Sequence, residues 1–231
     1  MNPKLDSDTG MEPFYTFHLE LKSLNKKLLH MSAQVEQRFR QAVSLIGNYH
    51  EQTAQSLILS DYLVDDLEVE IEEDCLKILA LHQPVASDLR FIITVIKVNN
   101  ELERIADMAV SIALRAQAIN KSASRDLVKG IDFSNMSENV ITMLKDSLDA
   151  LINRDTSLAR KVFMMDDRVD DQRNKVYTTI KDIIRKHPAH PGGLINTYLL
   201  ARHLERTADR ATNIAEEAIY LVEGVVTRSN S

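Results

Sequence analysis

The sequence is poor in glycine and proline, the two residues that interrupt helices most strongly. Its 231 residues include six Gly and five Pro, whereas average usage of roughly 12% would supply nearly thirty. A β-sandwich or β-barrel needs turn residues about every 8–12 residues, and collagen-like or linker-rich chains need still more Gly and Pro. These classes are therefore excluded. Long uninterrupted stretches remain, such as those from Pro84 to Gly130 and from Gly130 to Pro188, and long helices are the structures that fill them.

The chain also lacks a set of cysteines and a long apolar segment. Cys75 is its single cysteine, which excludes a disulfide framework and favours a reducing compartment. The longest stretch without Asp, Glu, Lys or Arg, residues 187–201, contains two Pro and two Gly and cannot span a bilayer. Residues 1–10 are polar and show no targeting pattern. The expected location is the cytoplasm.

A basic cluster is also missing. The formal net charge is −6, and a nucleic-acid-binding protein usually carries a basic stripe that neutralises phosphates. Residues 61–74 instead contain eight acidic side chains and no basic one. We interpret this segment as a solvated helix face that could also dock a basic partner, and we expect no nucleic acid among the partners.

Two short motifs occur twice, at similar offsets along the chain. Glu103-Arg-Ile-Ala-Asp107 recurs as Glu205-Arg-Thr-Ala-Asp209, and Asp61-x-x-Val64-Asp65 recurs as Asp166-x-x-Val169-Asp170. Such self-similarity is typical of an internal duplication. The predicted domains are residues 1–120 and 121–231, joined by a linker near residues 120–131.

Apolar residues recur in steps of three and four along most of the chain, which is the period of an amphipathic helix. Six helices are predicted, three in each half. Asp155 can cap the fifth, because an Asp side chain accepts hydrogen bonds from the first backbone N–H groups of a helix. The fold class is therefore all-α, with two tandem three-helix bundles related by duplication. The predicted helices span residues 14–46, 50–82, 86–120, 134–153, 156–186 and 193–223.

The repeated motifs carry paired carboxylates at positions i and i+4, which lie on one face of a helix. A single such pair is a weak signal in an acidic protein and usually indicates a solvated face. The repeated pairs are different because of their position. Pro84 is equally distant in sequence from Asp65 and Glu103, and it is also equally distant from Asp61 and Asp107. Two antiparallel helices joined at this turn would therefore bring the two pairs to the same height.

The second half repeats this spacing around its own proline. Pro188 is almost equally distant in sequence from Asp170 and Glu205, and almost equally distant from Asp166 and Asp209. Four carboxylates at one seam repel one another and raise one another's pKa unless a cation intervenes. A metal ion is the simplest such cation. The pairs Glu70/Asp74 and Asp167/Asp171 have no repeat partner and are interpreted as solvated.

Oxygen ligands alone favour hard or borderline ions such as Mg, Ca, Mn or Fe, whereas structural zinc prefers Cys or His. The chain contains no Glu-x-x-His sequence, which argues against a di-iron oxidase. The halves also differ, because Asn100 and Glu101 correspond to Arg202 and His203. We expect the second cluster to bind fewer ions or to bind them less tightly, and we expect His203 to be a surface or supporting residue. No catalytic residue is predicted.

At these residues the chain resembles the PhoU family of phosphate-signalling proteins. The resemblance covers nearly the whole chain, and the doubled Glu-Arg-x-x-Asp motif is specific. The family usually has Gly before the motif's final Asp, where this chain has Ala106 and Ala208, so slightly less close helix packing is expected. The segments that carry the resemblance are Gln83-Pro84, Asp88-Leu89-Arg90, Leu102 to Asp107, Leu204 to Asp209, Asn213-Ile-Ala-Glu216 and Tyr220-Leu-Val-Glu-Gly224.

The resemblance implies a non-enzymatic cytoplasmic regulator of phosphate uptake. Such proteins link the phosphate ABC transporter, through its nucleotide-binding subunit, to a sensor histidine kinase, and they hold the phosphate regulon off when phosphate is plentiful. A homodimer is implied, as is contact with the membrane only through partners. The resemblance further implies multinuclear clusters of Fe, Mn or Mg, held by Asp61, Asp65, Glu103, Asp107, Asp166, Asp170, Glu205 and Asp209.

Two other functions are compatible with the residues. A carboxylate-bridged metalloenzyme of the helical-bundle type would show turnover and a substrate-sized pocket at the clusters. A purely structural helical adaptor would carry the same acidic side chains without ever binding metal.

Overall fold

The computed structural model describes residues 11–189 and 191–228, with side chains from residue 15 onward. The described residues form helices and no strand, as the scarcity of Gly and Pro predicts. The helices are α1 (Met11–Gly47), α2 (Glu51–Leu59), α3 (Tyr62–His82), α4 (Ala86–Asn120), α5 (Arg125–Val128), α6 (Ser134–Asn153), α7 (Thr156–Lys186) and α8 (Pro191–Glu223).

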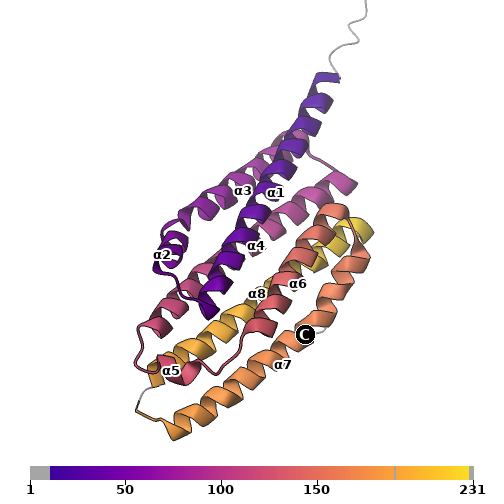
Figure 1. Cartoon of the computed structure of the whole chain (residues 1–231). Coiled ribbons are helices and arrows are strands. Elements are labelled where there is room, and N and C mark those ends of the chain that lie inside the picture. The colour runs from indigo at the N-terminus through magenta and orange to yellow at the C-terminus, as the bar shows by residue number, and fades with distance from the viewer. Residues whose placement is uncertain (1–10, 190, 229–231) are drawn as a thin grey trace, which may run out of the picture.

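The long helices form two three-helix bundles, so the predicted all-α tandem architecture is confirmed. In the first bundle α1 packs against α3 and α4, and in the second α6 packs against α7 and α8. The most extensive contact in the molecule joins α4 to α8, which lie side by side at its centre (Figure 1). None of the helices in the described part of the chain has a long enough apolar segment to cross a membrane.

The apolar stripes predicted from the sequence form the core. On α4 the stripe from Val95 to Ala116 is buried, and on α8 the corresponding stripe from Leu200 to Ala218 is buried too. Small residues such as Ala109 and Ala211 within these stripes let helices approach closely. Cys75 lies in the core, where burial raises the pKa of its thiol to about 12, as expected for a structural cysteine.

Three predicted helices, α4, α6 and α7, have the expected bounds. The chain between α6 and α7 turns because Arg154 adopts a left-handed conformation with φ 55°. The Asp155 carboxylate then accepts hydrogen bonds from the backbone N–H groups of Ser157, at 2.9 Å, and Leu158, at 3.0 Å. The predicted cap of α7 is confirmed.

The predicted helix over residues 50–82 is wrong in one respect, because it is broken at Ser60 and Asp61 into α2 and α3. Arg38 of α1 stabilises the break. Its guanidinium donates hydrogen bonds to the carbonyl of Leu57 at 3.0 Å and to the carbonyl of Ser60 at 3.1 Å. These groups at the end of α2 therefore have partners outside the helix. The linker also contains the short helix α5, which the sequence did not predict.

Polar side chains cross the contact between α4 and α8 and show that the two helices run antiparallel. Lys97 pairs with Glu217 at 2.8 Å, and Glu101 binds Arg210 and Asn213, both at 3.2 Å. Farther along the same contact, Arg115 donates to the side chain of Asn196 at 3.2 Å. Ala106 and Ala208 lie between these two groups of contacts and are both buried. Ala106 and Ala208, which stand where Gly was expected, are therefore on buried faces of the two central helices.

Candidate metal centre

The first carboxylate cluster lies at the seam between α3 and α4. Asp61 immediately precedes α3 and Asp65 lies in its first turn, while Glu103 and Asp107 lie one turn apart on α4. The turn at Pro84 returns the chain so that α3 and α4 pack together. Asp61 interacts electrostatically with Asp107, and Glu103 interacts with Asp65. The structure therefore brings together the four side chains that the sequence placed at equal distances from Pro84.

Burial and mutual repulsion perturb the carboxyl groups of this cluster. Burial, followed by repulsion from Asp107 and Glu68, raises the pKa of Glu103 to about 7. The pKa values of Asp61 and Asp107 are also raised, again mainly by burial and then by repulsion from Asp65. Each of these three carboxyl groups thus retains its proton more strongly than in water. This is the behaviour expected of clustered anions without enough neighbouring positive charge.

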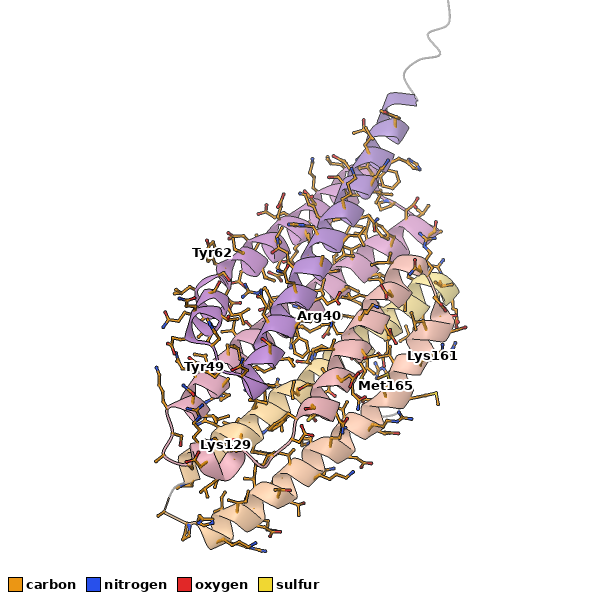
Figure 2. The ribbon with its side chains drawn as sticks, in the orientation of Figure 1. Arg40, Tyr49, Tyr62, Lys129, Lys161 and Met165 are labelled. Carbon is orange, nitrogen blue, oxygen red and sulfur yellow. The ribbon has the colours of Figure 1, made fainter. Side chains whose placement is uncertain are left out.

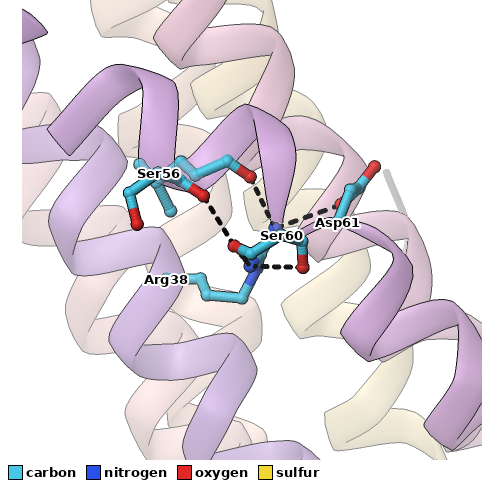
Figure 3. A network of polar contacts seen from close by, with 5 residues as sticks. Arg38, Ser56, Ser60 and Asp61 are labelled. Atoms are coloured by element: carbon cyan, nitrogen blue, oxygen red, sulfur yellow. Dashed lines mark hydrogen bonds and ion pairs between the residues drawn. The ribbon is translucent and has the colours of Figure 1, made fainter. Parts of the chain in front are cut away.

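One cation, Arg38, reaches the cluster from α1. Its Nη2 atom lies 3.2 Å from Asp61 Oδ1, and Nη2 and Nη1 also donate to Leu57 and Ser60 at the break between α2 and α3 (Figure 3). Arg38 was not among the site residues predicted from the sequence. A signal was present, because Arg38 occupies an apolar-stripe position of α1 between Val35 and Ala42. A charged residue in such a stripe is rarely buried without a partner.

Glu68 is a fifth carboxylate at this seam and was also not predicted from the sequence. It follows Asp61 and Val64 in the inward stripe of α3, and its charge contributes to the raised pKa of Glu103. Its backbone carbonyl accepts a hydrogen bond of 2.8 Å from Asn99 of α4. Glu68 therefore faces the same seam as the predicted residues.

The second cluster lies at the seam between α7 and α8. Burial, followed by repulsion from Asp209 and Asp170, raises the pKa of Asp166 to about 6. Burial also raises the pKa of Glu205 and of Asp209, and the mutual repulsion of the cluster adds to it. The structure thus also brings together the four residues predicted around Pro188.

Arg173 distinguishes this second cluster from the first. Its Nη2 atom lies 3.5 Å from Asp170 Oδ1 and 3.6 Å from Glu205 Oε1. The guanidinium therefore bridges a carboxylate of α7 and a carboxylate of α8. The sequence signal for Arg173 was again its position, one helical step after Val169 and one before Val176 in the inward stripe of α7.

The positions at which the two halves differ, Glu101 and His203, have distinct environments. Glu101 binds Arg210 and Asn213 across the contact between the bundles. His203 was expected to be a surface or a supporting residue, and the first alternative does not hold, because both of its ring nitrogens are buried and have no hydrogen-bond partner. Burial, together with the positive charge of nearby arginines, lowers the pKa of His203 to about 4.

The carboxylate pairs without a repeat partner are neutralised or solvated. Lys27 of α1 lies 2.6 Å from both Glu70 and Asp74. Asp167 and Asp171 are exposed on α7. These two pairs therefore have an ion-pair partner or are exposed to solvent, in contrast to the carboxylates at the seams.

The two clusters differ in their fit to a metal ion. In the part of the chain that the structure describes, no group of three or more His, Cys, Asp or Glu side chains is gathered closely enough to hold one. The donors of the first cluster are carboxylate oxygens, which suit a hard cation, and Arg38 reaches only Asp61 among them. The second cluster already contains Arg173 between its two helices. The first cluster therefore fits a metal in its donor chemistry, and the second does not fit one while Arg173 is in place.

A groove lies elsewhere on the molecule. It has a volume of about 720 Å³ and is lined by residues at the ends of α1 and α4, around α5 and at the start of α6. Tyr49 and Lys129, at the same end of the molecule in Figure 2, contribute to its wall. No cluster carboxylate lines this groove. It therefore does not provide the substrate pocket at the clusters that a metalloenzyme would need.

The family model for the PhoU domain matches the chain twice, at residues 28–116 and 133–218. The phosphate-specific transport system accessory protein PhoU homolog of Clostridium acetobutylicum is 34% identical over 209 residues, which are 90% of this chain and 94% of that protein. The phosphate-specific transport system accessory protein PhoU of Escherichia coli K12 is 30% identical over 208 residues, which are 90% of this chain and 86% of that protein.

Solved structures show the same fold. The crystal structure of PhoU from Pseudomonas aeruginosa superposes with a TM-score of 0.84 at 33% identity, covering 90% of this chain and all 100% of that one. The phosphate transport system regulatory protein PhoU from Streptococcus pneumoniae superposes with a TM-score of 0.81 at 26% identity, covering 92% of this chain and 99% of that one.

Proposed function

The chain belongs to the PhoU domain family, and from that membership we propose that it is a non-enzymatic accessory protein of a phosphate-specific transport system. The observation that carries this proposal is the double match of the PhoU domain, together with relatives named for that role that align over 90% of the chain.

The finer proposal is that the protein acts in the cytoplasm as a negative regulator of the phosphate regulon. It couples the nucleotide-binding subunit of the phosphate ABC transporter to a sensor histidine kinase and adjusts phosphate uptake. In this role it works as a homodimer and reaches the membrane only through its partners. The acidic outer face of α3, with exposed Tyr62, Val69 and Leu76 among its carboxylates, offers a surface suited to a basic partner.

We further propose that the carboxylate seams are cation sites, the second one only when Arg173 moves out of it. Fe, Mn or Mg, when bound in a multinuclear cluster, would supply the positive charge that the seams lack. In the first half Asp61, Asp65, Glu103 and Asp107 would hold it, and Asp166, Asp170, Glu205 and Asp209 are the corresponding residues of the second half. These side chains lie on both helices of each seam, so their mutual repulsion opposes the packing of α3 on α4 and of α7 on α8, and a bound cation would relieve it.

Deletion of the gene tests the regulatory role. We expect phosphate-starvation genes to be expressed in phosphate-rich medium after deletion, and the wild-type gene to restore repression. Unchanged expression would contradict the proposal. Oligomeric state is checked separately by light scattering on the purified protein, where a monomer would exclude the homodimer.

Elemental analysis tests the cation sites. Wild type incubated with Mn²⁺ or Fe²⁺ should retain metal, and Asp65→Ala/Asp107→Ala should lose the ions of the first cluster. Asp167→Ala/Asp171→Ala is the matched control, because it removes an exposed carboxylate pair of the same spacing. Equally negligible metal in wild type and both variants would favour a purely structural adaptor.

A further inference from the structure

The two halves carry opposite charges at one equivalent position. The sequence offset that relates Asp61 to Asp166 and Asp65 to Asp170 also relates Glu68 to Arg173. Both side chains lie on the inward stripe of their helix and interact with the glutamate at the corresponding place on the facing helix, Glu103 or Glu205. The first cluster therefore has an additional anion where the second has a cation.

The arginine of the first half occupies a different place. The same offset relates Arg38 of α1 to Met143 of α6, and both side chains are buried. Arg38 contacts one cluster carboxylate, Asp61, and its remaining hydrogen bonds hold the break between α2 and α3. Because it approaches from α1, Arg38 does not bridge the carboxylates of α3 and α4 in the way that Arg173 bridges those of α7 and α8.

We propose that Arg173 is the built-in cation of the second carboxylate cluster, so that a divalent metal binds the first cluster in preference to the second. This inference rests on the proposed cation sites. A guanidinium stays protonated at all physiological pH values. The guanidinium of Arg173 lies within 3.6 Å of carboxylates on both helices, and because it is part of the chain it cannot diffuse away. A metal ion that enters this seam must either displace the Arg173 side chain or bind more weakly because the guanidinium repels it.

The expected preference is large. At the effective dielectric of a protein surface, a unit positive charge about 4 Å from an incoming cation lowers the affinity for that cation by roughly a thousandfold for each unit of the cation's charge. Displacement of the side chain reduces this effect, and we therefore expect the second cluster to bind Mn²⁺ at least about tenfold more weakly than the first.

Mn²⁺ binding by equilibrium dialysis, followed by elemental analysis, tests the inference. The background is Asp65→Ala/Asp107→Ala, so that the first cluster contributes nothing. Adding Arg173→Gln should create Mn²⁺ binding, and adding Asp170→Ala/Asp209→Ala should abolish it again. Arg168→Gln is the matched control, since it removes the same charge from an exposed position on α7 and should create no binding. Absence of a gain with Arg173→Gln would overturn the inference.

The reciprocal substitution gives an independent result if Arg173→Gln fails to fold. Glu68→Arg in the wild-type chain places a guanidinium at the equivalent position of the first seam, and Mn²⁺ affinity there should fall at least about tenfold. Glu68→Gln should retain binding, because it removes an anion without adding a cation. Equal affinities of the two variants would overturn the inference.

The Mn²⁺-binding results distinguish the role of Arg173 from the proposed cation sites and from the proposed regulatory role. A wild-type chain that binds no Mn²⁺ while Arg173→Gln gains binding contradicts the first cation site and supports the role of Arg173. Wild-type binding that Asp170→Ala/Asp209→Ala reduces as much as Asp65→Ala/Asp107→Ala overturns the role of Arg173 and leaves the cation sites supported. Expression of phosphate-starvation genes reports on the regulatory role by itself.

Discussion

Arg38 and Asp61 form an ion pair of 3.2 Å between α1 and the start of α3. The pair joins the first carboxylate cluster to the break between α2 and α3, because the same guanidinium donates to the carbonyls of Leu57 and Ser60. Asp61 makes no capping hydrogen bond with its own helix. The local backbone and the charge of the cluster are therefore controlled by one side chain from a distant part of the sequence.

Arg38→Met should destabilise the protein. The substitution copies Met143, the corresponding residue of the second half, but it leaves Asp61 and two carbonyls without their partner. We expect the free energy of unfolding to fall by about 2–3 kcal/mol, measured by urea denaturation. Arg40→Met is the control, because Arg40 is an exposed neighbour on α1 (Figure 2). Its ion pair with Glu36 is of the surface i,i+4 type and is worth at most about 0.5 kcal/mol. Equal losses in the two variants would contradict the bracing role of Arg38.

Glu103→Gln should change how stability depends on pH. The pKa of Glu103 is raised from 4.5 to about 7 in the folded chain, so the folded state binds this proton more tightly than the unfolded state. The resulting stabilisation is fully present below about pH 4.5 and is lost as pH rises through about 7. Glu103→Gln should therefore be more stable than metal-free wild type at about pH 8, by on the order of 1 kcal/mol at this half-exposed site.

Urea denaturation in the presence of a chelator checks this prediction at about pH 5 and pH 8. At the lower pH, where Glu103 is mostly protonated, the difference between the two proteins should be smaller. Glu72→Gln, at an exposed position on α3, serves as the control and should show no comparable change. A gap between wild type and Glu103→Gln that is constant with pH would contradict the prediction.

His203→Leu should protect the protein at acidic pH. The pKa of His203 is lowered from 6.5 to about 4, first by burial and then by Arg115, Arg206 and Arg202. The unfolded chain therefore accepts this proton more readily, and stability is lost as pH falls from about 6.5 to about 4. Wild type should lose about 1–2 kcal/mol more than His203→Leu between about pH 7.5 and pH 5. Thermal unfolding at both pH values measures this, and parallel profiles would show that His203 does not titrate as described.

Two adjacent glycines of α8 should respond in opposite ways to alanine. A Cβ atom at Gly193 would collide with the side chains of Ser122 and Ser124, whereas a Cβ at Gly192 has open space. Gly193 also donates its backbone N–H to Ser124 Oγ at 3.1 Å. Gly193→Ala should cost about 1–3 kcal/mol, and Gly192→Ala should stabilise α8 by up to about 1 kcal/mol. Thermal unfolding ranks the two, and a Gly193→Ala variant as stable as Gly192→Ala would contradict the close packing of α8 on the linker.

The bounds of α4, α6 and α7 were predictable because their signals are local. Pro84 ends the preceding helix by its own geometry, and Asp155 caps α7 with its own side chain. Neither signal depends on a distant neighbour. The equal height of the carboxylate pairs was predictable for a related reason, since residues equally distant from a turn lie at the same height on two antiparallel helices. Whether the pairs face each other depends on how the helices rotate about their axes, which the sequence left open.

The break at Ser60 and the bridging by Arg173 were not predictable in the same way. The apolar period shows that Arg38 and Arg173 point inward, but it does not show what lies opposite them. Arg38 reaches the end of a different helix, α2, and Arg173 reaches Glu205 on α8. Long side chains such as these can satisfy several alternative partners, and the choice depends on how neighbouring helices rotate about their axes.

The sequence by itself determined the all-α class, the duplication, most helix bounds and the pairing of the eight carboxylates, because breaker positions and periodicity act within one helix or one turn. Tertiary structure alone decided which cation each cluster contains, because charge compensation depends on helices brought together from distant parts of the chain. The first cluster has an arginine at its edge and the second has one between its helices. Two sites that look equivalent as sequence motifs are therefore electrostatically different.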